Sequence, residues 1–212
     1  MISPECRISV IIPALNEGQV IRALLESLQS MRLDGHELIL VDGGSSDDTC
    51  FQAVPLVDRL ITSTPGRARQ MNEGARVAAE DILWFVHADS QLPADAGRQV
   101  CQAMQSGKAH WGRFDVEIIG QHPLLKLVSW MMNWRSRWTG IATGDQAIFV
   151  RRDAFFSIGG FPEIPLMEDI AISTRLKRIS SPCCLRTRLR TSGRRWERNG
   201  VVSTILLICQ LP

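Results

Sequence analysis

Short apolar runs alternate with amphipathic stretches along the first ninety residues of the chain. The runs are rich in isoleucine, valine and leucine, as in buried strands, and the stretches between them repeat apolar residues at helical spacing. The predicted order is strand 8–12, helix 20–31, strand 38–41, helix 47–54, strand 59–62, helix 67–79 and strand 82–86. Because βα units in series form parallel sheets, this pattern predicts an α/β fold with a doubly wound, Rossmann-like and mostly parallel sheet flanked by helices.

The pattern changes after residue 89. Residues 114–118 read FDVEI, and this alternation of apolar and acidic residues predicts a half-buried, antiparallel strand. The other predicted elements are helix 94–105, helix 124–138, strand 147–150, helix 166–178 and an alternating strand 185–190. No repeat or flexible linker separates this mixed half, about 91–200, from the first half, about 7–90, so residues 1–212 are predicted to form a single domain.

Composition adds a charge asymmetry to this picture. The chain has 212 residues, 45% of them hydrophobic, which is enough for one substantial core. Its net charge of +2 is uneven: residues 175–212 hold nine basic residues and one acid, a net +8, which leaves −6 for residues 1–174. The basic end suits phosphate groups or an anionic membrane face, and a solvated basic surface is the alternative.

Cysteine spacing and hydropathy bear on location. The six cysteines form no C-x-x-C pair and no zinc pattern, so they are predicted to be reduced thiols of a cytoplasmic protein. No secretory leader is recognisable, and no apolar stretch reaches the roughly 18 residues that a membrane span needs. The chain is therefore expected to be neither secreted nor membrane-spanning.

Several phosphate and hydrolase motifs are absent. There is no G-x-x-x-x-G-K-[ST] and no G-x-S-x-G, and the turn after the first strand reads PALNE rather than G-x-G-x-x-G. With these motifs excluded, the candidate functional groups that remain are carboxylates. Asp42 and Asp89 each follow an apolar strand, where a carboxylate can meet a ligand or bind a divalent cation; the alternative is that each caps a turn or helix.

Four sequence blocks resemble the successive signatures of family 2 glycosyltransferases with a GT-A fold. They are ISVIIPALNE at 8–17, VDGGSSDDT at 41–49, GRARQMNEGA at 66–75 and FVHAD at 85–89. The resemblance runs from about residue 7 to about 200. It implies a transferase that takes a sugar from a nucleoside-diphosphate sugar, most often a UDP- or GDP-sugar, with Mg²⁺ or Mn²⁺. It also implies that the first half binds the donor and the second half binds the acceptor.

The resemblance implies a set of nucleotide-sugar contacts. In this sequence they are Pro13, Ala14, Asn16, Glu17, Asp42, Gly43, Ser45, Arg67 and Gln70. Among these Asp42 is expected to read the base, and Arg67 has a surface charge at a helix start as its alternative. Asp89 matches the last acid of the D-x-D metal motif, whose first acid is replaced by His87. His87 is therefore either a second ligand or a hydrogen-bonding neighbour, and diphosphate and water would complete the shell.

The motif LMEDI at 166–170 resembles the E-D pair that opens the acceptor-side helix. The resemblance implies that Asp169 is the catalytic base of an inverting transfer, supported by Glu168. The alternative is that both acids only stabilise a helix N-terminus. Asp145 is a weaker candidate in the donor or acceptor site, with a turn as its alternative. Arg195 is a candidate diphosphate contact, and Ser192 stands where processive members have glutamine, so polymer synthesis is not expected.

Trp130, Trp134 and Trp138 are spaced four residues apart and are predicted to share one face of a helix. The face suits the core, a peripheral contact at the inner membrane face, or a lipid-linked acceptor. The hydroxyl acceptor is expected to be either a small molecule or lipid-linked. The apolar residues 201–212 fit a dimer contact. A nucleic-acid partner is not expected. Two other functions stay open: a non-catalytic nucleotide-sugar-binding protein, and a sugar nucleotidyltransferase, whose glycine-rich, lysine-bearing first loop is missing.

Overall fold

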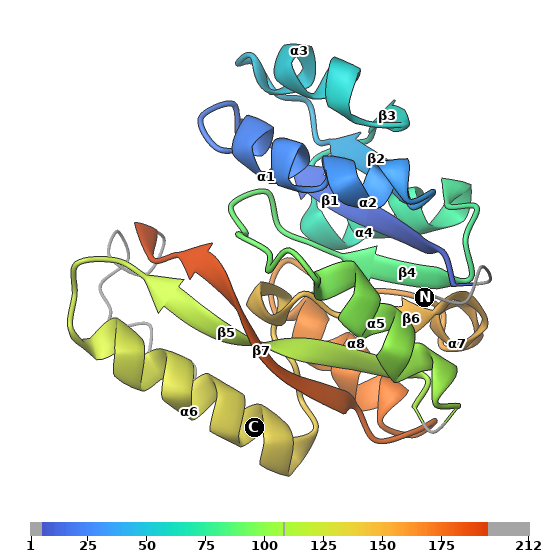
Figure 1. Ribbon diagram of the computed structural model, residues 1–212, viewed down its shortest axis with the longest axis vertical. Coiled ribbons are helices and arrows are strands. Elements are labelled where there is room, and N and C mark those ends of the chain that lie inside the picture. Colours follow the sequence, from blue (N-terminus) through green and yellow to red (C-terminus); the bar gives the residue numbers. More distant parts are fainter. Residues whose placement is uncertain (1–5, 108, 195–212) are drawn as a thin grey trace.

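A seven-stranded sheet runs through the molecule between two layers of helices (Figure 1). The computed structural model describes residues 6–107 and 109–194. The strands are β1 Ile8–Ala14, β2 Glu37–Asp42, β3 Arg59–Thr62, β4 Ile82–Phe85, β5 Trp111–Ile119, β6 Phe149–Arg151 and β7 Cys183–Ser192. Their order in the sheet is β3-β2-β1-β4-β6-β5-β7.

Strand direction follows the two halves of the sequence. β1 pairs in parallel with β2 and β4, and β2 pairs in parallel with β3. β6 runs antiparallel to both β4 and β5, while β7 is parallel to β5. The predicted α/β sheet with a mixed second half is thereby confirmed. Because β1, β2 and β4 run in one direction, their carboxyl ends meet at one edge.

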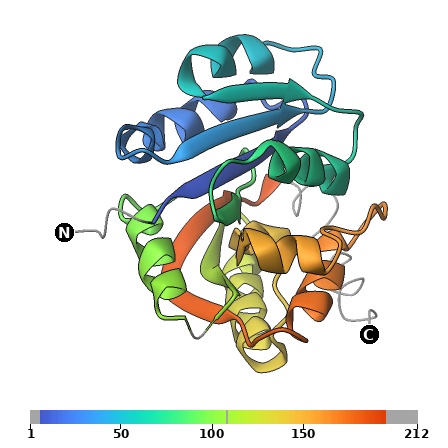
Figure 2. The same cartoon turned by 90° about the vertical axis from the view of Figure 1, so that its right-hand side faces the viewer.

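Helices cover both faces of this sheet (Figure 2). α1, α5 and α6 pack on one face, and α4, α7 and α8 pack on the other. The helices are α1 Ile21–Ser27, α2 Gln29–Leu33, α3 Thr49–Ala53, α4 Arg67–Val77, α5 Ala96–Gln105, α6 Leu124–Thr139, α7 Arg152–Ser157 and α8 Glu168–Leu176, with 3₁₀ turns η1 Val54–Leu56 and η2 Gly144–Gln146.

Burial on two faces explains the apolar runs of the first half. In β1, Ile8, Val10 and Ile12 enter the core under α1 and α5, whereas Ile11 enters the core under α4. Successive residues of a strand point to opposite faces, so a strand covered on both sides must be apolar throughout. Two predicted elements needed adjustment: helix 20–31 divides into α1 and α2, and strand 147–150 is replaced by β6 at Phe149–Arg151. Helix α7 was not predicted.

β5 is the strand whose environment the sequence misjudged. The prediction of a half-buried strand is wrong, because all but its last residues are covered. Asp115 is 8% exposed and pairs with the fully buried Arg113 and, at 2.6 Å, with Arg137 of α6. The side chain of Asn133, from α6, accepts the N–H of Val116 of β5 at 2.8 Å and donates to the Val116 carbonyl at 2.9 Å. Paired charges and α6 side chains thus allow an alternating strand to be buried.

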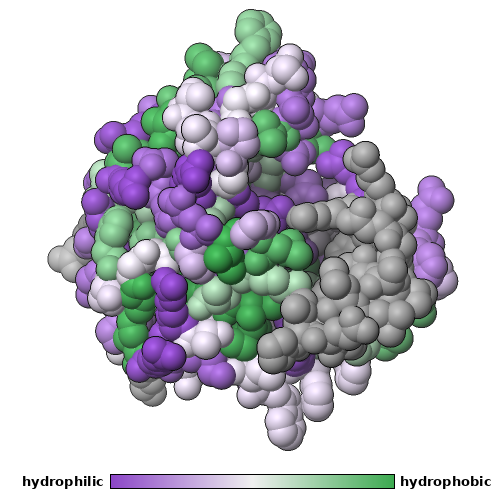
Figure 3. Space-filling view, turned by 180° about the vertical axis from the view of Figure 1, so that it is seen from behind, coloured by the Kyte–Doolittle hydropathy of each residue, from purple (hydrophilic) through white to green (hydrophobic). Residues whose placement is uncertain are grey.

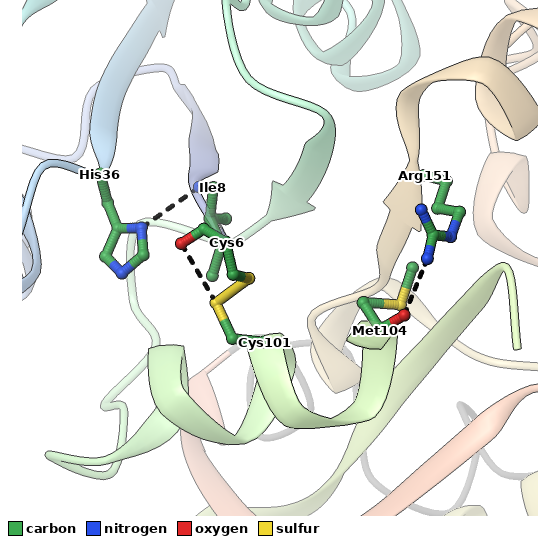
Figure 4. Close-up of a disulfide and its surroundings, with 6 residues drawn as sticks. All are labelled: Cys6, Ile8, His36, Cys101, Met104 and Arg151. Carbon is green, nitrogen blue, oxygen red and sulfur yellow. Dashed lines mark hydrogen bonds between the residues drawn. A yellow bond between two sulfur atoms is a disulfide. The ribbon is translucent and has the colours of Figure 1, made fainter. Parts of the chain in front are cut away.

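The prediction that all cysteines are reduced is also wrong. Cys6, just before β1, forms a disulfide with Cys101 of α5, 95 residues away (Figure 4). Cys50, Cys183 and Cys184 are free thiols. A pair so far apart in sequence is brought together by the fold and leaves no spacing signal. The thiol argument for a cytoplasmic location is thereby lost, and that location stays a prediction.

Two further expectations concern membrane-spanning helices and the C-terminal residues. Within residues 6–107 and 109–194, the structure contains no helix with the length and apolar character of a membrane span. Arg195, Trp196 and the apolar residues 201–212 lie outside the described residues.

Candidate active site

Asp42 ends β2 at the edge where the parallel strands finish. It is 4% exposed, and its Oδ2 accepts the N–H groups of Gly44 and Ser45, both at 3.0 Å. Gly44 has φ +93°, a conformation that favours glycine. The Gly43 N–H donates to the Ala14 carbonyl at 2.9 Å. Asp42 therefore shapes the loop after β2, as its turn alternative required, and holds its carboxylate in one orientation.

The loops after β1 and β2 are tied together. The Asn16 N–H donates to Ser45 Oγ at 2.8 Å, and the Ser46 N–H donates to Asn16 Oδ1 at 2.9 Å. The Glu17 N–H donates to Thr49 Oγ1 at 2.9 Å. Asn16 itself has φ +54°, which asparagine tolerates better than most residues. These contacts place Asn16, Glu17 and Ser45 next to one another, and their role in nucleotide binding stays a prediction.

Gln70 of α4 lies beneath these loops. It is 4% exposed, and its Nε2 donates to the carbonyls of Ala14, at 2.8 Å, and Val41, at 2.9 Å. Pro13 is the strand partner of Val41, so Gln70 bridges the last residues of β1 and β2. A Cβ on Gly43 would lie 3.1 Å from the Gln70 amide. Gln70 therefore supports the loops from below, and a direct nucleotide contact stays a prediction.

Charged side chains gather beyond the end of β4. Asp89 accepts a long hydrogen bond from Thr191 Oγ1 at 3.5 Å, and Arg194 Nη2 lies 3.9 Å from Glu17 Oε2. The pKa of Glu17 is raised, mainly by burial and next by the Asp89 carboxylate, while Arg194 and His87 oppose the rise. A cation near these side chains would offset the repulsion that Glu17 experiences from Asp89. The structure thus brings Glu17, His87 and Asp89 together.

His87 is held by the turn η2. Its Nδ1 lies 3.3 Å from Asp145 Oδ1. A Cβ added to Gly144 would lie 2.6 Å from His87 Cε1 and 2.7 Å from Nε2, so the ring packs directly on the Gly144 backbone. The edge of the imidazole that carries both nitrogens therefore faces η2. This favours the hydrogen-bonding alternative for His87, and metal ligation stays a prediction.

The same turn holds Asp169, the second residue of α8. The Gly144 N–H donates to Asp169 Oδ2 at 2.6 Å, and the Ile170 N–H donates to Oδ1 at 2.8 Å. The pKa of Asp169 is raised, mainly because burial disfavours its charge and further by the nearby carboxylates of Glu168 and Asp145; the two N–H groups oppose the rise. A raised pKa brings a carboxylate closer to the range of an effective general base.

Glu168 and Arg67 face each other across a cleft of about 220 Å³. Glu168 is 5% exposed, and its Oε1 lies 3.5 Å from Arg67 Nη1. A second ion pair, Arg69 Nη2 to Glu163 Oε2 at 3.0 Å, also connects α4 to the segment around the start of α8. Other cleft residues are Pro65, Gly66, Ala68, Ile164 and Pro165. α4 and α8 belong to the face seen in Figure 3, where hydrophobic residues gather near the middle and hydrophilic residues lie mainly above them and to their left.

A second, very small cavity connects the features of the site. Its volume is about 10 Å³, close to the space of one water molecule. It is lined by Met71, Phe85, His87, Gly144, Ile148, Phe161, Glu168 and Asp169. The sequence reasoning missed Gly144, although a glycine directly before Asp145 was a signal. It also missed the positive φ of Met167, +69°, which turns the chain just before α8.

Comparison with known proteins decides the family. Residues 9–157, well over half of the chain, match glycosyl transferase family 2. The chain belongs to this family. A PGL/p-HBAD biosynthesis glycosyltransferase of Mycobacterium bovis BCG is 33% identical over 174 residues, which are 72% of this chain and 62% of that protein. The chain therefore spans less than two thirds of the length of this relative.

Solved structures extend the comparison to the fold. S. aureus TarS 1-349 in complex with UDP-GlcNAc superposes with a TM-score of 0.69 at 17% identity, covering 89% of this chain and 59% of TarS. Glucosyl-3-phosphoglycerate synthase from Mycobacterium tuberculosis, in complex with Mn²⁺, UDP and glucosyl-3-phosphoglycerate, gives 0.65 at 20% identity, covering 97% and 80%. At these identities the superpositions show the fold, and the predicted GT-A fold of family 2 is confirmed.

Proposed function

We propose that this chain transfers a sugar from a UDP- or GDP-sugar to a hydroxyl acceptor with inversion at the anomeric carbon. Membership of family 2 supports the activity class. The observation that carries the proposal is the turn η2, because Gly144 contacts both the Asp169 carboxylate and the His87 ring. Asp89 lies two residues after His87, so in this proposal η2 contacts the base directly and packs against a ring close in sequence to the metal carboxylate.

The proposed donor-binding site is formed by the loops after β1 and β2, which are hydrogen-bonded to each other. Asp42, fixed by two backbone N–H groups, has a carboxylate that can accept a hydrogen bond from the base. The loop of Asn16 and Glu17 lies beside it, and Arg67 is 38% exposed at the cleft, where its guanidinium can contact a phosphate. Asp145 and Arg195 remain proposed contacts, the latter outside the described residues.

The carboxylates near β4 fit a divalent cation of limited protein coordination. In the described part of the chain, no group of three histidines, cysteines or acids is arranged to hold a metal alone. Mg²⁺ accepts one or two carboxylates completed by substrate phosphates and water, so Asp89, with His87 as a further candidate, suits an ion that arrives with the donor. When bound, Mg²⁺ or Mn²⁺ would supply charge stabilisation for the departing diphosphate.

Asp169 performs the proton transfer in this proposal. The acceptor oxygen attacks the anomeric carbon, its proton passes to Asp169, and the bond from that carbon to the diphosphate oxygen breaks with its electron pair. Glu168 is adjacent, and its charge contributes to the raised pKa of Asp169. The exposed Ile164 and Leu166 before α8 are compatible with a partly apolar, lipid-linked acceptor.

The decisive experiment separates binding from turnover. Thermal shifts with UDP- and GDP-sugars, with and without Mn²⁺, measure donor binding, since a ligand at roughly 100 times its Kd adds about 2.7 kcal/mol. Asp169→Asn should retain the shift and lose about 10²- to 10⁴-fold in transfer or donor hydrolysis. Asp153→Asn, at an exposed acid in α7, is the control. Unchanged turnover in Asp169→Asn refutes the base, and donor binding without any turnover favours a non-catalytic binder.

A further inference from the structure

The outer face of α6 is apolar although nothing in the described structure covers it. Leu127, Trp130, Met131, Trp134 and Trp138 are 42–76% exposed. The indole rings stack in sequence, with centroids 6.2 Å apart for Trp130 and Trp134 and 5.3 Å for Trp134 and Trp138. We call these five side chains the tryptophan face.

The inner side of α6 already packs against the core and bonds to β5. Leu125, Val128 and Met132 are buried in the core, and Ser129 and Asn133 bond to β5. The helix is thus apolar on both sides, and this is typical of helices that meet a second apolar phase. Exposed apolar patches of this kind mark interaction surfaces rather than ordinary solvent-facing helices.

Charge distinguishes between the possible occupants of this face. Residues 118–144 include Lys126, Arg135 and Arg137 and contain no acid. Asp115, which contacts α6 from β5, is buried between Arg113 and Arg137. A second copy of the chain, packed through this face about a two-fold axis, would place these positive charges near one another. Anionic lipid headgroups would neutralise them, and tryptophan is enriched where headgroups meet acyl chains.

We propose that the tryptophan face seats α6 in the interface of an anionic lipid bilayer. The indole rings and Leu127 would enter the headgroup region, and Lys126 and Arg135 would lie beside phosphate groups. α6 leads through Gly140 into Ala142, whose N–H donates to Ser173 of α8 at 3.1 Å, and then into η2. If the proposed transfer is correct, the bilayer contact would hold the base at a fixed depth for a lipid-linked acceptor.

Co-sedimentation of the full chain with lipid vesicles tests this surface. Vesicles of phosphatidylcholine with phosphatidylglycerol should bind the protein at low salt, and binding should weaken without phosphatidylglycerol or at high salt. The triple variant Trp130→Gln, Trp134→Gln, Trp138→Gln should raise the lipid concentration for half-binding by about tenfold or more, and Lys126→Glu should raise it less. The double variant Leu33→Gln, Phe51→Gln, at side chains 88% and 84% exposed elsewhere, should bind normally.

Other results would overturn the proposal or assign the tryptophan face to another partner. Equal binding by the wild-type protein and the triple variant, or no binding by the wild-type protein, overturns the proposal. A dimer that the triple variant dissociates, without vesicle binding, assigns the face to a second copy instead. If circular dichroism shows that the triple variant is misfolded, Trp138→Gln alone, at a side chain 76% exposed, replaces it. Vesicle binding is measured without donor or acceptor, so its failure leaves the proposed transfer intact.

Discussion

Replacing Gly144 by alanine tests the geometry that joins His87 to the proposed base. Gly144 is not among the positive-φ glycines, so alanine fits the backbone, and the effect of the methyl group is steric. That Cβ would lie 2.6 Å from His87 Cε1. Carbon atoms pack at about 3.5 Å or more, so the ring or the turn must move by roughly 0.9 Å.

The expected loss of activity depends on the contacts that hold the His87 ring and the η2 turn in place. The ring is held by Asp145 at 3.3 Å, and the turn by the bond from the Gly144 N–H to Asp169 at 2.6 Å. Overpacking costs about 1–3 kcal/mol in stability, whereas a misplacement of about 1 Å costs about 10²-fold in rate. We therefore expect kcat to fall by about 10²-fold with a modest loss of Tm. A weaker N–H bond also raises the pKa of Asp169 further, which moves the acid limb of the pH–rate profile upward.

Steady-state transfer measured against pH, together with thermal unfolding, checks this expectation. Gly97→Ala is the matched control, because its Cβ would also lie 2.6 Å from a neighbour, but that neighbour is the flexible end of Met31, remote from the site. Gly97→Ala should keep wild-type kcat. If folded Gly144→Ala shows the wild-type kcat and pH profile, η2 does not position the base and the reasoning fails.

Other predictions concern protonation, the disulfide and a buried ion pair. Because the pKa of Asp169 is raised and the base must be ionised, activity should fall as pH drops through a value above the usual 4 for aspartate; an acid limb at or below 4 would contradict this. Reduction of Cys6–Cys101, or Cys6→Ser, should lower the unfolding free energy in urea by up to about 4–5 kcal/mol, given the 95-residue separation, with turnover at 25 °C unchanged. Equal urea midpoints with and without reductant would show that the bond contributes nothing. Asp115→Asn should cost about 3–5 kcal/mol, because it leaves Arg113 charged and fully buried; a urea-measured loss under about 1 kcal/mol would refute that pairing.

The strands of the first half could be predicted because their burial is simple. A strand covered on both faces must be apolar, and its end is marked where polar residues return. Ile8, Ile12 and Val41 follow this rule, and all three are fully buried. The acid at the end of β2 was predictable for the same reason. Its hydrogen bonds to Gly44 and Ser45 were foreseen only as an alternative, since one carboxylate can shape a loop and face a ligand.

The second half was harder because polar groups there are satisfied by distant partners. Nothing local to Asp115 shows that Arg137, 22 residues later, will neutralise it and permit burial. Nothing near Cys6 indicates Cys101. Periodicity reports the environment of a residue only when solvent and apolar core are the only choices. Ion pairs, disulfides and side chains that cover a strand provide a third environment, in which polar residues are buried with a partner. The pattern of apolar and polar residues does not predict burial at such positions.

The contacts around η2 connect the two halves of the chain. β4 of the first half pairs with β6 of the second half, and Trp84 Nε1 donates to the Ala147 carbonyl at 3.1 Å just after η2. His87, from the first half, packs directly on Gly144, and the Gly144 N–H donates to Asp169. If the proposed roles are correct, the base takes its position from the segment after β4, which also holds the proposed metal carboxylate Asp89. Residues 7–90 expressed alone would lose both the proposed base and β6, the antiparallel partner of β4, so the proposed site requires the mixed sheet as a whole.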